Sequence, residues 1–353
     1  MKILKVVLIF LYILLFQKSF AQKFKITGGI DTYYAINPID LTQKTAPIYV
    51  SSNQLNSPSI NLALIEFKYQ PTEKIRFQLS PAFGTYMNTN YSGEKKHLRW
   101  IYESYLGISF GKNKKQWLDF GVYSSPYTFE TPKSWDQLMY TRSLAPEFVP
   151  YYITGLRYQN EISKKLKLSL FLLNGWQKIG FQNKIPSLGT QLEYKVDKHS
   201  ISLTTYSGNE KTATQPDFGF RFFTEFSWAF EKNKWKTQTC FYSGWQKIIN
   251  GNYKNWFQIN GLAAYQLTKK SSLTFRQEYF HDPSKIQIST NSTYSGFSGS
   301  VSSFGISLKP KEFLLFRVEG KSLYSSKNTG LFILKNQETN WLPLLFVNLS
   351  IFL

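Results

Sequence analysis

The feature that most limits the fold of this chain is a repeated alternation of apolar and polar residues. In residues 218–230 six aromatic side chains share one face, while Arg221, Glu225 and Ser227 lie on the other. The same period of two recurs in residues 166–172, 188–196 and 314–321. This is the period of a β-strand, whose successive side chains point to opposite faces. Charged residues opposite stripes of Phe and Leu are incompatible with a dry core, but they can face a water-filled lumen.

Two kinds of break separate the alternating segments. Seven breaks are short and polar, at residues 71–74, 111–115, 163–165, 197–199, 231–234, 268–271 and 309–312. The breaks between them are longer and rich in Ser, Asn, Pro, Gly and Tyr. Bacterial outer-membrane barrels have short periplasmic turns and long extracellular loops. We therefore predict an all-β fold, a transmembrane antiparallel up-and-down β-barrel.

The turns also give the number of strands. Seven turns join fourteen strands, and one terminal strand at each end brings the count to about sixteen, with fourteen or eighteen as open alternatives. The predicted strands begin near residues 24, 59, 75, 98, 117, 151, 166, 188, 200, 217, 235, 254, 272, 297, 313 and 341. An even number places both termini on the periplasmic side. A barrel of this size is expected to enclose an aqueous channel rather than a packed interior.

The first residues have the pattern of an export signal. Lys2 and Lys5 precede an apolar run at residues 6–16 that is short for a membrane span, and Ala21 follows as a small residue at the cleavage point. We expect residues 1–21 to be a cleaved signal peptide and residues 22–353 to be one barrel domain; a membrane-anchoring helix is the alternative. This predicts the outer membrane of a Gram-negative bacterium, with its lipid as a partner.

Composition narrows the remaining partners. The chain has 42 Lys and Arg against 22 Asp and Glu, a net charge of +20. A soluble protein this basic would first suggest nucleic acid, but an exported one does not, and anionic membrane surfaces or solutes fit better. Cys240 is the single cysteine, so an internal disulfide is excluded. A secreted soluble β-sandwich would leave its long Phe and Leu stripes exposed, which argues against it.

A series of short motifs occurs in a set order along the chain. They are Gly29-Ile30-Asp31-Thr32-Tyr33-Tyr34, Gly84-Thr85-Tyr86-Met87, Trp117-Leu118-Asp119-Phe120-Gly121, Thr141-Arg142-Ser143-Leu144, Pro150-Tyr151-Tyr152 and Leu173-Asn174-Gly175-Trp176-Gln177. In this order they resemble the OmpL-like β-barrel porins of Bacteroidota. The resemblance covers most of the chain and is densest between residues 24 and 180. It implies an outer-membrane barrel with a diffusion role, and it leaves the substrate unassigned.

The longest break, residues 124–150, is the third extracellular loop in this count. In general sixteen-stranded porins the third loop folds into the lumen and narrows it, and by resemblance we expect the same here. The candidate constriction residues are Glu130, Lys133, Trp135, Asp136, Arg142 and Glu147. Side chains of this kind would filter solutes by size and by electric field. A solvated outer loop is the alternative.

Strand parity predicts which charges line the lumen. The predicted wall residues are Arg76, Glu103, Arg157, Arg221, Glu225, Lys236, Arg276, Glu278, Arg317 and Lys321. The basic residues outnumber the acidic ones, and rings of Arg and Lys favour anionic solutes. We therefore predict a weak preference for anions.

A five-residue repeat, Gly-Trp-Gln-Lys-Ile, occurs at residues 175–179 and 244–248. In this count both copies end strands on the loop side. Tryptophan at such a position is typical of the aromatic girdle at the membrane interface. We expect Trp176 and Trp245 to face the membrane.

The residue types that carry catalysis are scattered. His97, His199 and His281 fall near a loop end, in a short turn and near another loop, which makes neither a metal site nor a triad. We therefore expect no enzyme activity and no metal or other cofactor. The alternative is an outer-membrane esterase or phospholipase, which would need a Ser–His pair on the loop-side rim, with His97 or His281 as the histidine.

These observations predict an outer-membrane porin for passive diffusion of small polar, and by its wall charge anionic, solutes. The alternative is a non-transport barrel whose extracellular loops bind a surface partner or a glycan. A lumen filled by side chains would favour binding, and an open path would favour transport. General porins are often trimers, but the sequence identifies no face for a homo-oligomer. It also leaves open the solute, the pore width and any gating.

Overall fold

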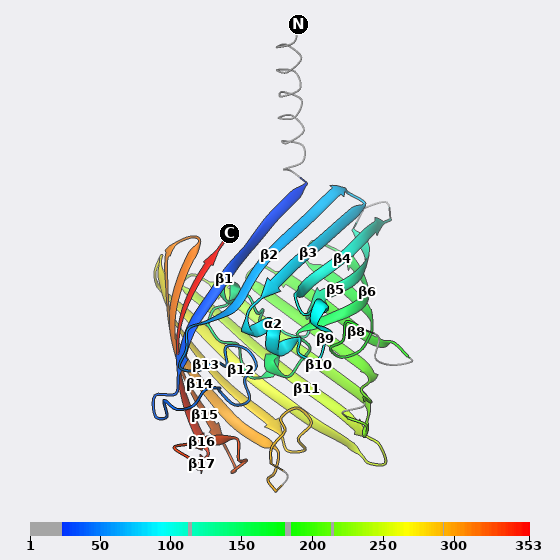
Figure 1. Ribbon diagram of the computed structural model, residues 1–353. Coiled ribbons are helices and arrows are strands. Elements are labelled where there is room, and N and C mark those ends of the chain that lie inside the picture. Colours follow the sequence, from blue (N-terminus) through cyan, green and yellow to red (C-terminus); the bar gives the residue numbers. More distant parts are fainter. Residues whose placement is uncertain (1–22, 112–114, 181–184, 213–214, 292) are drawn as a thin grey trace.

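The computed structural model describes residues 23–111, 115–180, 185–212, 215–291 and 293–353. The predicted signal peptide, residues 1–21, lies outside the described residues, as does the middle of the predicted turn at residues 111–115. Sixteen antiparallel strands of the described chain form one closed barrel (Figure 1). No helix in the described ranges is long and apolar enough to cross a membrane.

The barrel strands are β1 (Phe24–Ile36), β2 (Ser59–Thr72), β3 (Ile75–Phe83), β4 (Ile101–Phe110), β5 (Gln116–Ser124), β6 (Tyr152–Glu161), β7 (Leu166–Leu173), β8 (Ser187–Val196), β9 (His199–Asn209), β10 (Phe218–Lys232), β11 (Trp235–Ile248), β12 (Tyr253–Thr268), β13 (Ser271–Asp282), β14 (Phe297–Lys311), β15 (Leu314–Ser325) and β18 (Trp341–Phe352). A two-stranded hairpin, β16 (Phe332–Leu334) and β17 (Gln337–Thr339), lies in the last long loop. The helical turns in the loops are α2 (Thr85–Asn90), η1 (Lys96–Leu98), η2 (Ser134–Asp136) and η3 (Ala145–Glu147).

The strand count and the strand positions predicted from the sequence are confirmed. Fourteen and eighteen strands are both excluded for the barrel. Every barrel strand begins within three residues of its predicted start. The largest difference is at β4, which begins at Ile101 rather than near Leu98 because Lys96–Leu98 form the turn η1.

The barrel closes between the two ends of the chain. β18 pairs with β15 on one side and with β1 on the other, where the register runs from Gly29 opposite Phe352 to Ile36 opposite Leu345. Closure satisfies the backbone N–H and C=O groups that an open edge would leave unpaired in hydrocarbon. The short turns lie at the same end as the C-terminus, and the long loops lie at the opposite end (Figure 1). We call these the periplasmic end and the loop end, following the usual orientation of such barrels.

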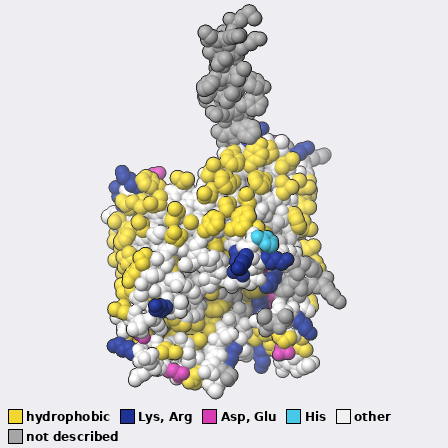
Figure 2. Space-filling model, viewed as in Figure 1, with side chains coloured by type: hydrophobic (Ala, Val, Ile, Leu, Met, Phe, Trp, Pro, Cys, Tyr) yellow, Lys and Arg dark blue, Asp and Glu magenta, His cyan; other side chains and the backbone are white. Residues whose placement is uncertain are grey.

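The outer face of the barrel is apolar, and the inner face carries the polar side chains. On β10, Phe220, Phe222 and Phe226 are exposed, while Arg221 and Glu225 between them are buried inside the barrel. Figure 2 shows hydrophobic side chains over much of the outer wall on the face in view. This is the alternation that a lipid-facing strand needs.

The aromatic-girdle prediction is correct for Trp245 and wrong for Trp176. Trp245 is 41% exposed on the outer face of β11. Trp176 instead packs inside the barrel, with its ring centroid 4.8 Å from that of Tyr206 and 5.2 Å from that of Phe223. The reason is local: β7 ends at Leu173, so the first copy of the repeat lies in a loop, where strand parity no longer fixes its direction.

If the outer face meets lipid, a charge placed on it destabilises the barrel. Phe226 is 42% exposed on β10, and we expect Phe226→Arg to lower the free energy of unfolding by about 2–4 kcal/mol, the cost of arginine near the bilayer midplane. Urea unfolding in phospholipid vesicles measures this, with Phe226→Leu as the apolar control. Equal stability of the two variants would show that this face does not contact hydrocarbon.

Candidate functional site in the lumen

The third loop lies inside the barrel. Residues 125–151, which we call loop 3, leave the end of β5 and run through the lumen before entering β6. The Ser134 hydroxyl lies 3.0 Å from that of Ser350 on β18, and the Trp135 ring stacks on Phe352 at 6.0 Å between centroids. Because Phe352 is at the periplasmic end, loop 3 extends along most of the lumen. The solvated outer loop, the alternative considered from the sequence, is not what the structure shows.

A buried arginine on β13 is the main attachment of loop 3. The Arg276 side chain is fully buried, and its Nε donates to Glu278 Oε1 at 3.0 Å. Its Nη2 lies 3.6 Å from Glu319 Oε1, and its Nη1 lies 3.4 Å from Glu130 Oε1 of loop 3. The same Nη1 donates to the Thr141 carbonyl oxygen at 2.6 Å. One guanidinium therefore contacts two wall carboxylates and joins them to the loop.

The wall carboxylates also hold the backbone of loop 3 directly. Glu319 accepts a hydrogen bond from the Thr141 N–H at 2.7 Å, and Glu278 accepts one from the Leu144 N–H at 2.6 Å. Hydrogen bonds to an ionised group are about twice as strong as neutral ones. The conformation of this stretch is thus fixed by charges on β13 and β15.

Further wall residues support the remaining part of loop 3. Arg317 on β15 donates from Nη1 to the Ser134 carbonyl oxygen at 2.7 Å. Lys321 on the same strand lies 3.2 Å from the Arg142 carbonyl oxygen through Nζ. Loop 3 is therefore attached to the wall at several levels of the barrel.

The first extracellular loop, residues 37–58, packs on loop 3 through an ion pair. Arg142 Nη2 lies 2.9 Å from Glu147 Oε1, and both side chains are buried. The other Glu147 oxygen accepts hydrogen bonds from the backbone N–H groups of Val50 at 2.9 Å and Ser51 at 2.8 Å. Burial alone would lower the pKa of Arg142, but the adjacent Glu147 carboxylate raises it above the usual range. The contacts of Glu147 with Arg142 and with the Val50 and Ser51 amides join the two loops.

The six candidate constriction residues are all on loop 3, but most of their charges are paired. Glu130, Arg142 and Glu147 are buried in the contacts described above. Lys133 Nζ lies 2.9 Å from Glu66 Oε1 on β2. Asp136 is exposed to the vestibule described below. The paired charges therefore mainly attach loop 3 to the barrel wall and to the first loop. They contribute little to an electric field across the lumen.

The opposite wall holds a second ionic group. The buried Asp119 on β5 lies 2.6 Å from Arg76 Nη2 and 3.0 Å from Arg157 Nε. Both arginines were predicted to face the lumen, and they do. Asp119 was missed, although it alternates with the exposed Leu118 and Phe120 and parity could have placed it inside. Glu103, also predicted to face inward, accepts a hydrogen bond from the Ser124 N–H at 2.9 Å.

At the loop end the lumen is packed with side chains. Tyr127 of loop 3 contacts Trp176 and Phe223, and the Arg221 guanidinium lies 4.7 Å from the centroid of the Trp176 ring. These residues belong to a large buried cluster that also includes side chains of the first loop. The aqueous channel expected from the strand count is therefore narrowed in this half of the barrel, because two loops fold inward and bury their side chains there.

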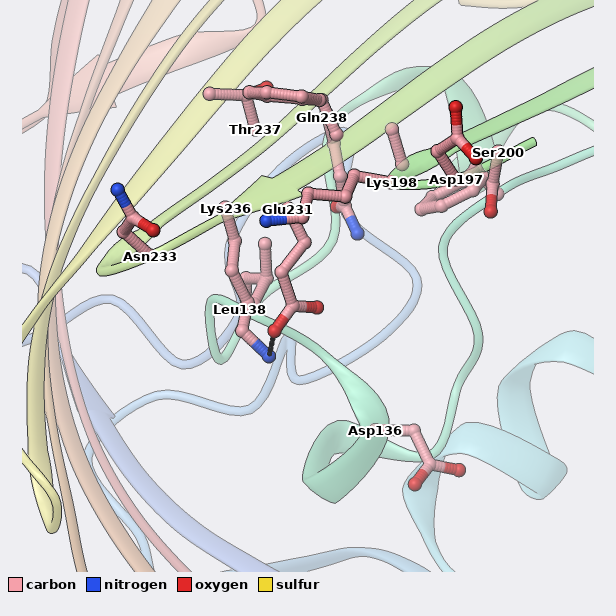
Figure 3. Close-up of a pocket in the computed structure, with 13 residues that line it drawn as sticks. Asp136, Leu138, Asp197, Lys198, Ser200, Glu231, Asn233, Lys236, Thr237 and Gln238 are labelled. Carbon is pink, nitrogen blue, oxygen red and sulfur yellow. Dashed lines mark ion pairs between the residues drawn. The ribbon is translucent and has the colours of Figure 1, made fainter. Parts of the chain in front are cut away.

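The periplasmic half is hollow. A cavity of about 700 Å³ lies between loop 3 and β9–β11, and it is lined by residues that include Asp136, Leu138, Lys198, Glu231 and Lys236 (Figure 3). In Figure 3 the Lys236 ammonium points to Glu231, and the two groups are 2.9 Å apart.

Two smaller cavities adjoin the first. One of about 200 Å³ shares Leu138 and Lys236 with it, and another of about 290 Å³ shares Phe129 and Ser200 with it. We call the three cavities together the vestibule, and its three parts the large, lysine and β8–β10 cavities.

The charged residues that line the lysine cavity are all positive. Its charged lining residues are Lys234, Lys236, Lys269, Lys270 and Lys309. No Asp or Glu of the described chain lines it. This part of the vestibule is suited to attract anions.

The hydrogen bonds of the histidines within the described ranges do not include a Ser–His–carboxylate triad. The ring Nδ1 of His281 lies 2.8 Å from the Ser298 hydroxyl, which is the kind of Ser–His pair considered above. No carboxylate of the described chain is hydrogen-bonded to that ring, which instead packs 5.0 Å from Phe257. No group of three or more His, Cys, Asp or Glu residues in this part of the chain could hold a metal ion.

Comparisons with known proteins agree with this architecture. The model of the family described as "Putative beta-barrel porin-2, OmpL-like" matches residues 23–352. Sequence comparison with curated proteins finds no relative.

Solved porins share the fold. The anion-selective porin from Comamonas acidovorans aligns with a TM-score of 0.64 at 10% identity, covering 94% of this chain and 99% of that one. The outer membrane channel DcaP of Acinetobacter baumannii gives 0.63 at 10% identity, with 94% and 97% covered. Salmonella typhi OmpF, in complex with daunomycin, gives 0.63 at 12% identity, with 94% and 97% covered.

The attachment of loop 3 can be tested at Arg276. Replacing a buried, paired charge leaves its partners uncompensated and typically costs about 3–5 kcal/mol, so we expect Arg276→Gln to release the loop from the wall. Hydrogen exchange at the Thr141 and Leu144 amides should then become at least about tenfold faster. The matched control is Arg157→Gln, because Arg157 pairs with Asp119 on the far wall. Unchanged protection of both amides in Arg276→Gln would contradict this attachment.

Proposed function

This chain belongs to the OmpL-like β-barrel porin-2 family, and we propose that it is an outer-membrane porin for small polar solutes with a preference for anions. The observation that carries the proposal is the hollow, lysine-rich vestibule at the periplasmic end of a closed sixteen-strand barrel. Passive diffusion through such a barrel needs no reaction and no cofactor.

The preference for anions is inferred from unpaired charge. Three arginines deep in the lumen, Arg76, Arg157 and Arg276, form ion pairs with wall carboxylates, so their net field is reduced. Lys269 and Lys270 instead line the lysine cavity, and neither forms an ion pair within the described ranges. Cationic residues with low-dielectric walls around them raise the local concentration of anions. The selectivity would therefore arise at the periplasmic mouth, and not at loop 3.

The upper size of the solutes that can cross is inferred from the packing at the loop end of the barrel. Loop 3 and the first loop fill that half of the lumen with buried side chains. Solutes that cross must use the room these loops leave. The proposal therefore requires a narrow pore that admits only small solutes.

One observation favours the alternative, a non-transport barrel whose extracellular loops bind a surface partner or a glycan. The buried cluster at the loop end contains Tyr127, Tyr206, Phe223 and Tyr242, and these rings pack that part of the lumen. A barrel of this kind would be fully sealed by its loops. Solute flux distinguishes the two functions.

Flux can be measured by liposome swelling with neutral sugars of graded size and with small organic acids. We expect purified protein in liposomes to admit a pentose quickly, a disaccharide slowly and a tetrasaccharide hardly at all. Protein-free liposomes are the control. No swelling with any solute would exclude the porin and leave the binding barrel.

Anion preference can be measured as a reversal potential in planar bilayers under a salt gradient. We expect the wild type to show the anion-selective sign. The double variant K269E/K270E replaces two positive charges of the vestibule by two negative ones, and should shift the potential toward the cation-selective sign. The control is K95E/K96E, the same change at exposed lysines on the loop side. A cation-selective wild type, or equal shifts in both variants, would refute selection at the vestibule.

A further inference from the structure

We propose that the β8–β10 cavity is a binding subsite for a small neutral polyhydroxylated solute of the monosaccharide class, with Glu225 as its principal hydrogen-bond acceptor. The inference goes beyond passive diffusion, because it places a specific recognition site on the wall of the vestibule. The subsite rests on the proposed function in one respect, because the solute has to enter the barrel. Binding does not require that the solute crosses the membrane.

Glu225 is a buried carboxyl group, and only one of its two oxygens accepts a hydrogen bond in the structure. The residue lies on β10, is 1% exposed, and lines the cavity. Its Oε2 accepts a hydrogen bond from the Thr204 hydroxyl at 3.0 Å. Its Oε1 has no hydrogen-bond partner among the described residues. A buried acceptor without a partner is costly, so an oxygen of this kind marks a place where a donor is expected.

Further polar groups lie beside Glu225 on the same wall. Ser227 follows it on the inner face of β10, and Ser202 of β9 lies opposite Ser227 in the strand register. The Ser202 hydroxyl has no hydrogen-bond partner within the described chain, and the Ser227 hydroxyl lies beside the Glu225 carboxyl group. Gln191 of β8 lies opposite Thr204, which itself lies opposite Glu225. Three neighbouring strands thus present a carboxylate, two hydroxyls and an amide to one cavity.

The charges around the cavity favour a neutral ligand. No Lys or Arg of the described residues forms an ion pair with Glu225. An anion would be repelled by this carboxylate. A cation would meet Lys195, which also lines the cavity, while Glu193 is already paired with Lys167 at 3.1 Å. A neutral hydroxyl can donate a hydrogen bond to a Glu225 carboxyl oxygen without either conflict.

The size and position of the cavity fit a small solute. Its volume of about 290 Å³ is near the lower end of the range of about 300–1,000 Å³ for small-molecule pockets. Phe129 of loop 3 and Ser200 of β9 line both this cavity and the large one. The β8–β10 cavity therefore adjoins the large cavity at these two residues, and the buried Glu225 lies on its wall.

The test is binding to the purified, detergent-solubilised full barrel, measured by isothermal titration and by saturation-transfer NMR. The probes share one carbon skeleton and differ in charge: glucose, gluconate and glucosamine. We expect glucose to bind more tightly than either charged analogue. Glu225→Gln should weaken glucose binding at least about tenfold, because it removes a charged acceptor. The double variant S202A/S227A should weaken it by a smaller factor.

The control is Glu161→Gln, which removes an exposed carboxylate at the periplasmic end of β6, outside the three cavities of the vestibule. We expect its glucose affinity to equal that of the wild type, and the β-sheet circular dichroism of every variant to match as a check on folding. No glucose binding, or equal affinity in Glu225→Gln, would overturn the subsite and show that water alone fills the cavity. Tighter binding of glucosamine would overturn the neutral-ligand assignment.

These outcomes are separable from the failure of the porin proposal. If liposomes swell with small sugars while the purified barrel binds no glucose, the pore stands and the subsite is refuted. If glucose binds and no solute causes swelling, the subsite stands and the porin proposal is refuted.

Discussion

The pairing of β18 with β1 is the constraint on which the rest of this molecule depends. In hydrocarbon an unpaired strand edge leaves backbone groups without partners, so the sheet must close on itself. Closure with sixteen strands brings the start of β1 and the end of β18 to one end of the barrel and sends the long loops to the other. It also creates an interior wide enough that side chains from the wall alone do not fill it. What occupies that interior is decided by the loops.

Loop 3 occupies the lumen because charges on the wall hold it there. Arg276 contacts Glu278 and Glu319 on the wall and Glu130 of the loop, while the wall carboxylates accept hydrogen bonds from the loop backbone. Each of these charges would be costly to bury alone, but together they are satisfied. The loop therefore separates the barrel into a packed half at the loop end and a hollow half at the periplasmic end. Both functional proposals depend on this division.

The barrel itself could be predicted from the sequence, because strand parity and turn composition are local signals. They placed every strand within three residues, and they placed Arg76, Arg157 and Arg276 on the inner face. Pairing between distant residues has no such signal. Nothing in the sequence shows that Glu130 meets Arg276 or that Glu147 holds the first loop, so the charges expected to set a field were found in ion pairs. Trp176 was placed wrongly because strand parity gives no direction for a side chain beyond the end of β7.

The central claim is that loop 3 lies inside the lumen against β18, and a disulfide cross-link tests it most directly. Ser134 and Ser350 have hydroxyl oxygens 3.0 Å apart, which suggests a spacing that a disulfide can bridge. Both positions are changed to cysteine in a Cys240→Ser background, and whole outer membranes are oxidised. The structure predicts an efficient cross-link, seen as a mobility shift of the unfolded chain that reductant reverses. The account would be contradicted if no cross-link formed and the cysteine at position 134 instead reacted with a membrane-impermeant thiol reagent from the cell exterior.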